Sequence, residues 1–149
     1  MSPRQGEDGR AIAPQVAEMD VLLVEADAQV REILAEELLD AGFDVALAPS
    51  AEAAMGILNT AGEADAPPTI LVTAMKLGED GDGLVLAEEV QRCWPGAGVI
   101  VMADSPERLG KPDPRKVWLR MPLGPLRLTT AVNELMLFGC GSRRDRFDL

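Results

Sequence analysis

The sequence predicts an α/β fold in which a parallel β-sheet is covered by helices on both faces. Short apolar runs of strand length alternate with segments in which apolar residues recur at helical spacing, and the pair repeats along the chain. The short runs are apolar throughout, which is typical of strands buried on both faces. At 149 residues and 47% hydrophobic composition, the chain has the length and apolar content for one such domain.

Each element has its own sequence signal. The predicted strands are residues 21–24, 43–48, 69–73, 98–102 and 117–120. Asp27 caps a helix that Gly42 stops, and Ser50 caps a second helix that carries apolar residues as far as Ala61. A loop is expected over residues 62–68 and a Gly- and acid-rich turn over 78–83. Asp82 caps a third helix that ends near Trp94, and the last helix covers residues 126–138.

The connection between the fourth and fifth strands departs from this regular pattern. Ser105-Pro106-Glu107 is a good helix start, but Gly110, Pro112 and Pro114 stop a helix after about one turn. We expect a shortened or irregular fourth helix there. The domain is predicted over residues 20–138, between a flexible N-terminal tail (1–19) and a C-terminal tail (139–149). Five strands in so short a chain favour the flavodoxin-like order 2-1-3-4-5. Any ligand site is then expected at the carboxyl ends of the strands, in residues 25–27, 74–76, 103–105 and 121–122.

Composition excludes several classes of function. The net charge of −11 argues against general binding to nucleic acid or to anionic membranes, and no apolar run is long enough to span a bilayer. Histidine is absent, which removes catalytic triads and most zinc sites. The two cysteines, Cys93 and Cys140, favour a reducing cytoplasm. We expect no enzymatic activity, no metal and no cofactor.

Several pieces of the chain, taken in order, resemble a response-regulator receiver domain of two-component signalling. Val21-Leu-Leu-Val-Glu-Ala-Asp27 resembles the first strand with its acidic loop, and Thr69-Ile-Leu-Val-Thr-Ala74 resembles the third strand. Gly81-Asp82-Gly83 resembles the turn before the third helix, and Leu119-Arg-Met-Pro122 resembles the fifth strand with its Lys-Pro dipeptide. The resemblance implies the CheY-like three-layer fold over most of the chain.

The resemblance also implies a phosphorylation pocket, and in this chain that pocket is degenerate. Ala74 stands at the phosphoacceptor aspartate, Ala26 at one of the two metal-binding acids, Ala103 at the switch hydroxyl and Met121 at the lysine; Glu25 and Pro122 remain. An alanine cannot accept a phosphoryl group, and the charges that such a transfer needs are absent. We therefore expect a pseudo-receiver that is not phosphorylated at Ala74.

Charge is distributed unevenly along the chain. Residues 21–104 contain 16 acidic and 3 basic side chains, whereas residues 105–149 contain 5 acidic and 9 basic ones. The basic residues, together with Trp118, form a candidate interaction face made of the fourth helix, fifth strand and fifth helix: Arg108, Lys111, Arg115, Lys116, Trp118, Arg120 and Arg127. Trp118 is either a fixed packed side chain or an exposed anchor for a partner.

The expected function is that of a stand-alone, phosphorylation-independent protein–protein interaction module in bacterial signal transduction. Its partner would be a histidine kinase, another regulator or a second copy, with a homodimer possible through the candidate interaction face. The alternative is a small-ligand sensor that uses the apolar pocket at the strand ends. Leu135 to Phe138 are four consecutive apolar residues, so part of the last helix should expose apolar surface.

Overall fold

The computed structural model describes residues 19–63, 68–78, 82–104 and 115–139. A five-stranded parallel sheet has the order β2-β1-β3-β4-β5, as predicted. Its strands are β1 (Val21–Val24), β2 (Val45–Ala48), β3 (Ile70–Ala74), β4 (Gly98–Ala103) and β5 (Lys116–Arg120). The helices are α2 (Ala28–Asp40), α3 (Ala51–Glu63), α4 (Asp82–Cys93) and α5 (Arg127–Glu134), followed by a π-helical turn (Leu135–Gly139).

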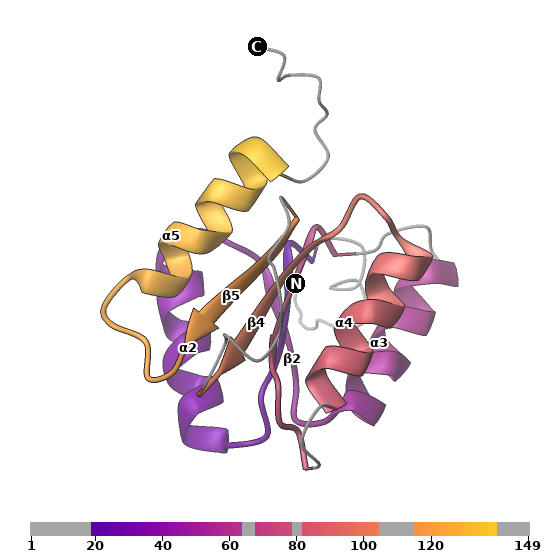
Figure 1. Ribbon diagram of the computed structural model, residues 1–149, viewed down its shortest axis with the longest axis horizontal. Coiled ribbons are helices and arrows are strands. Elements are labelled where there is room, and N and C mark those ends of the chain that lie inside the picture. Colours follow the sequence, from indigo (N-terminus) through magenta and orange to yellow (C-terminus); the bar gives the residue numbers. More distant parts are fainter. Residues whose placement is uncertain (1–18, 64–67, 79–81, 105–114, 140–149) are drawn as a thin grey trace, which may run out of the picture.

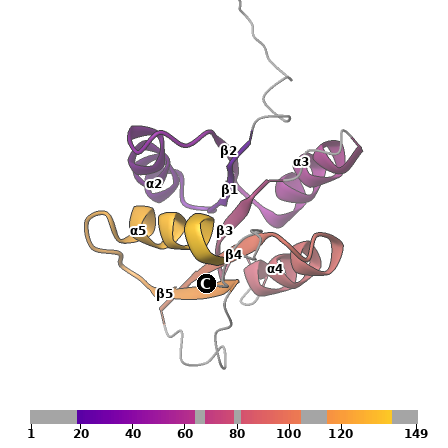
Figure 2. The same cartoon turned by 90° about the horizontal axis from the view of Figure 1, so that it is seen from above.

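The sheet is the middle of three layers (Figures 1 and 2). Helices α2 and α5 cover one face, and α3 and α4 cover the other. Because successive strand residues point to opposite faces, each strand contributes to two cores. In β1, Leu22 and Val24 pack on the α3/α4 side, whereas Val21 and Leu23 pack on the α2/α5 side. The uniformly apolar strands are explained by this double burial.

Two of the three predicted helix caps and the predicted stop are confirmed. Asp27 accepts hydrogen bonds from the backbone N–H groups of Gln29 and Val30, at 2.9 and 3.1 Å. Ser50 Oγ accepts one from the N–H of Ala53 at 3.0 Å. Gly42 follows α2 with φ +98°, a backbone conformation that favours glycine, as the predicted stop requires.

Several boundaries differ from the predicted ones. Strand β2 starts at Val45 because the N–H of Phe43 is used in closing the end of α2, on the Leu38 carbonyl at 3.2 Å. Helix α3 continues past Ala61 to Glu63. A Cβ at Gly62 would lie 3.3 Å from the Trp94 ring, so the absence of a side chain at this position lets the helix pack closely against that ring. Asp82 is the first residue of α4 rather than its cap.

The last helix and the tails also differ in detail. Helix α5 starts at Arg127, after Leu126 with φ 61°, and changes to a π-helical turn at Leu135. Leu137 is 66% exposed, which confirms the expected apolar surface. Met19, assigned to the N-terminal tail, is buried in the α3/α4-side core. The expected fourth helix lies within 105–114, outside the described residues. In the part of the chain that the structure describes, no helix could cross a membrane.

Candidate functional site

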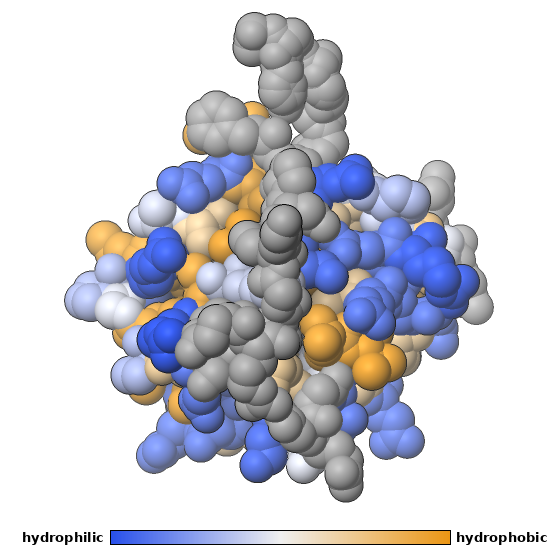
Figure 3. Space-filling model, in the orientation of Figure 1, coloured by the Kyte–Doolittle hydropathy of each residue, from blue (hydrophilic) through white to orange (hydrophobic). Residues whose placement is uncertain are grey.

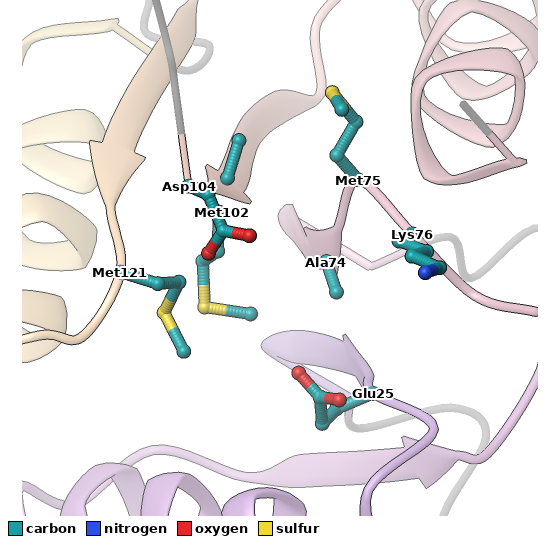
Figure 4. A pocket seen from close by; sticks show the side chains of 8 residues that line it. Glu25, Ala74, Met75, Lys76, Met102, Asp104 and Met121 are labelled. Atoms are coloured by element: carbon teal, nitrogen blue, oxygen red, sulfur yellow. The ribbon is translucent and has the colours of Figure 1, made fainter. Parts of the chain in front are cut away.

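An open pocket of about 220 Å³ lies where the carboxyl ends of β1, β3, β4 and β5 converge, as expected for a sheet of this type (Figure 4). It is lined by residues that end these strands or directly follow them: Glu25, Ala74, Met75, Lys76, Met102, Ala103, Asp104 and Met121. Parallel pairing brings the ends together, since Ala74 is opposite Met102 and Ala103 is opposite Arg120. The pocket is therefore a direct product of strand register.

Four of the six residues predicted for the degenerate pocket line it: Glu25, Ala74, Ala103 and Met121. Ala26 and Pro122 are exposed neighbours of two of these residues and do not contribute to the lining. Ala74 stands at the end of β3 and is half-buried, and Met121 directly follows β5 and is half-buried. The central wall of the pocket thus presents methyl and thioether groups.

Glu25 is the buried acid of the pocket, with 8% of its surface exposed. One carboxylate oxygen, Oε2, accepts the backbone N–H of Asp27 at 3.0 Å, which holds the side chain at the start of the loop after β1. Arg31 donates from Nη1 to the backbone carbonyl of Glu25 at 2.8 Å. The Asp27 N–H keeps the carboxylate directed into the pocket rather than outward, as seen in Figure 4.

Backbone hydrogen bonds fix the walls. The N–H of Met75 donates to the Met102 carbonyl at 2.8 Å, and the N–H of Met121 donates to the Ala103 carbonyl at 2.9 Å. Helix α4 is joined to the same corner by the Gly83 N–H, which donates to the Met75 carbonyl at 2.8 Å. These bonds extend the β3–β4 and β4–β5 pairing into the residues after the strands, so the pocket stands on ordered backbone.

Four further residues line the pocket: Met75, Lys76 and Asp104, which lie in the predicted strand-end ranges, and Met102, which was not predicted. Their signal was position, since Met75 and Lys76 directly follow β3 and Asp104 directly follows β4. Met102 is only 1% exposed and Met75 only 8% exposed, so both contribute buried thioether walls. Asp104 adds a second carboxylate, and Lys76 adds an exposed ammonium group.

The candidate interaction face is described only in part, because Arg108 and Lys111 lie outside the described residues. Arg115, Arg120 and Arg127 are exposed, and Lys116 is half-buried. Arg120 donates from Nη1 to the Asp104 carbonyl at 2.8 Å. Lys116, Trp118 and Arg120 alternate along β5 and so share one face of this edge strand.

Trp118 is half-buried and packs against the core on the α3/α4 side. Its indole Nε1 is buried, and no acceptor lies within hydrogen-bond distance of it among the described residues. This packing favours the fixed side chain over the exposed anchor. Across the described ranges, no group of three or more histidine, cysteine or acidic side chains is placed to hold a metal ion.

No protein-family model matches the sequence, and no curated protein matches it. Solved structures do match. The chain superimposes on a response regulator receiver protein from Sinorhizobium medicae with a TM-score of 0.67 and 24% identity, over 80% of this chain and 94% of that one. The receiver domain of PhyR from Erythrobacter litoralis matches with a TM-score of 0.66 and 20% identity, over 86% and 98%.

A third match is the response regulator protein TrrA from Thermotoga maritima, solved in complex with Mg²⁺ and BeF. Its TM-score is 0.63 at 18% identity, over 78% of this chain and 98% of that one. The five-stranded sheet, its order and its helices are those of the CheY-like fold of receiver domains. The predicted fold class is thereby confirmed.

Proposed function

We propose that the chain is a pseudo-receiver that acts in bacterial signal transduction, in the cytoplasm, by binding a protein partner and not by phosphoryl transfer. The observation that carries the proposal is Ala74 at the end of β3, lining the strand-end pocket beside Ala103 and Met121. Phosphoryl transfer to a carboxylate needs a nucleophile at the reacting position and cations on the transferring group. Methyl and thioether groups supply neither.

The loss of phosphorylation is tested with acetyl phosphate and Mg²⁺, using a phosphorylatable receiver as the positive control. We expect the intact mass of this chain to stay unchanged while the control gains one phosphoryl group. A phosphoryl adduct on Glu25 or Asp104, the two carboxylates that line the pocket, would contradict the proposal.

The basic face supports an acidic partner or a second copy of this chain. Arg115 and Arg127 are exposed, whereas residues 21–104 are rich in acids. The positive and negative charges of the domain are therefore concentrated on different parts of the molecule. On the part of the surface coloured in Figure 3, apolar residues form separate patches between polar ones and not one continuous face. Charge complementarity would therefore select the partner and its orientation. A histidine kinase, another regulator and a homodimer all remain candidates.

The partner is sought by affinity capture from the native cytoplasm with mass spectrometry. Two single variants, Lys116→Glu and Arg127→Glu, reverse charges on the face. The matched control is Arg92→Glu, which makes the same change on α4 and removes only an exposed pair with Glu89. We expect the face variants to lose a protein that wild type and Arg92→Glu both retain. Recovery of the same proteins by all four baits would contradict the proposed face.

A second candidate function is a small-ligand sensor, and the observation that favours it is the pocket itself. An open volume of about 220 Å³ with apolar walls is retained although the residues for phosphoryl transfer are gone. Drug-sized ligands occupy roughly 300–1,000 Å³, so the ligand would be smaller than a nucleotide. A reproducible rise in Tm with a small ligand, lost on filling the pocket with Ala74→Leu, supports the sensor.

A further inference from the structure

The strand-end pocket carries two acidic groups on opposite sides of an apolar wall. Glu25 enters from the end of β1 and Asp104 from the end of β4, and in Figure 4 both carboxylates point toward the space between them. Ala74, Met102 and Met121 line that space. Glu25 is buried and Asp104 is exposed, and two carboxylates that face one volume attract a cation into it.

The carboxylate of Glu25 is incompletely satisfied by the described residues. The residue as a whole is 8% exposed, and the hydrogen bond that the described residues supply to its carboxylate is the one from the Asp27 N–H to Oε2. A carboxylate has room for about four donors on its two oxygens. Oε1 is not among the buried atoms that lack a partner, so it faces the open pocket, where a donor from solvent or from a ligand can reach it.

Among the described residues, the nearby cations form no ion pair with either carboxylate. Arg120 donates to the backbone carbonyl of Asp104 at 2.8 Å, not to its carboxylate. The Arg31 guanidinium donates to the backbone carbonyl of Glu25, not to its carboxylate. Lys76 lines the pocket, but its ammonium lies on the other side of Ala74 from Met102 and Met121, as Figure 4 shows. Within the described residues, no ion pair joins Lys76 to either carboxylate.

The walls add a preference of their own. Met102 and Met121 present polarizable thioethers to the pocket. These groups favour contact with an alkyl chain or a weakly hydrated organic cation over contact with a strongly hydrated ion. The volume of about 220 Å³ accommodates a short chain of heavy atoms. A ligand that both pairs with the carboxylates and packs against the methyl and thioether groups therefore combines one positive charge with a short apolar chain.

We propose that this pocket binds a small organic cation, namely a primary ammonium or guanidinium group on a short alkyl chain. The cation donates to Glu25 Oε1 and to the Asp104 carboxylate, and its alkyl part packs on Ala74, Met102 and Met121. The cation comes either from a free amine or from a lysine or arginine side chain of a partner. The proposal rests on the second candidate function, that of the pocket as a ligand site.

The experiment is an NMR titration of the full chain with n-butylammonium and with n-propylguanidinium, against the neutral 1-butanol. We expect saturable shifts at the pocket residues and cation affinities roughly tenfold or more above that of 1-butanol, since a hydrogen bond to a charged group contributes about 1.5–3 kcal/mol. Glu25→Gln and Asp104→Asn should each lower the affinity for the two cations about tenfold. Glu36 is an exposed acid on α2, so Glu36→Gln is the control with the same change of charge and should leave both affinities unchanged.

The other outcomes separate the alternatives. Equal affinity for 1-butanol and the cations overturns the proposal but leaves an apolar ligand, and hence the sensor. Shifts confined to residues outside the pocket, or displacement of the cations by Mg²⁺ at equal concentration, also overturn it. A capped lysine, Nα-acetyl-lysine-N-methylamide, that binds more tightly than n-butylammonium assigns the cation to a partner side chain, and the reverse order assigns it to a free amine. The affinity-capture result does not depend on any of these.

Discussion

Gly83 seats the start of α4 against the end of β3, and its replacement by alanine is the sharpest test of the described packing. A Cβ at this position would lie 1.7 Å from the Ala74 carbonyl oxygen, 2.7 Å from the carbon of the same carbonyl and 3.0 Å from Met75 Cα. All three are backbone atoms of the pocket wall, so no side chain can rotate to make room. Gly83→Ala must therefore move the helix or the strand end.

The size of the effect follows from that geometry. Cβ atoms keep at least 3.0 Å from other heavy atoms, so the separation from the Ala74 oxygen has to grow by more than 1 Å. Such a shift weakens the hydrogen bond from the Gly83 N–H to the Met75 carbonyl, 2.8 Å in the native chain. Overpacking costs about 1–3 kcal/mol and the net loss of a hydrogen bond about 0.5–1.5 kcal/mol. Together they predict a fall in the free energy of unfolding of about 1.5–4.5 kcal/mol.

The matched control is Gly56→Ala in α3, where a Cβ would meet none of the described atoms within 4 Å. The same substitution there gains only helix propensity, worth about 0.4–1 kcal/mol. Urea titrations measure the free energy of unfolding, and thermal melts measure Tm. Gly83→Ala should lower Tm by about 6–18 °C and Gly56→Ala should raise it by about 2–4 °C, at about 4 °C per kcal/mol for this chain length. If Gly83→Ala is as stable as wild type while Gly56→Ala gains, the close approach of α4 to β3 is wrong.

Three further predictions concern single contacts. The Glu37 carboxylate accepts hydrogen bonds from the backbone N–H and the hydroxyl of Thr129, at 2.9 and 2.8 Å, and so caps α5 from α2. In urea titrations, Glu37→Gln should lower the free energy of unfolding by about 1–2 kcal/mol. The control Glu36→Gln should change it by less than about 0.5 kcal/mol. Trp118→Phe removes a buried N–H without an acceptor among the described residues and should stay within about 1 kcal/mol of wild type, whereas Trp118→Ala should lose about 2–3 kcal/mol by the same measurement. Ala74→Asp should not restore phosphorylation by acetyl phosphate, as intact mass will show, because Met121 supplies no cation at the end of β5.

The strands and their order could be predicted because each strand is buried on both faces and so has an uninterrupted apolar sequence. The boundaries were harder wherever a tertiary contact decides them. Phe43 belongs to the turn after α2 through its bond to Leu38, and α3 passes Gly62 because that glycine lies against Trp94. Neither contact leaves a mark in the local sequence. The Glu37–Thr129 contact joins residues 92 apart and has no sequence signal at all.

The candidate site shows the same division. Alignment of the strand ends placed Glu25, Ala74, Ala103 and Met121 together, because parallel strands end at one edge of the sheet. Which residues beyond those ends turn into the pocket depends on the path of the chain after each strand. Asp104 and Lys76 lie in the predicted strand-end ranges, but the sequence pattern alone could not tell which residues of those ranges line the pocket. The alternation of side chains along β5 determines which face of the sheet Trp118 lies on, but not how deeply its ring is buried.

The pocket and the basic face meet at one residue. Arg120, on β5, donates to the backbone carbonyl of Asp104, and the side chain of Asp104 lines the pocket. A cation that engages the Asp104 carboxylate therefore acts on the residue that holds Arg120 in place. If occupancy changes the affinity for a partner, the partner must change the affinity for the cation by the same factor. A factor of one means that the two surfaces work separately. A factor that differs from one in wild type and returns to one in Arg120→Lys, which keeps the charge but alters the donor geometry, would assign the coupling to this bond.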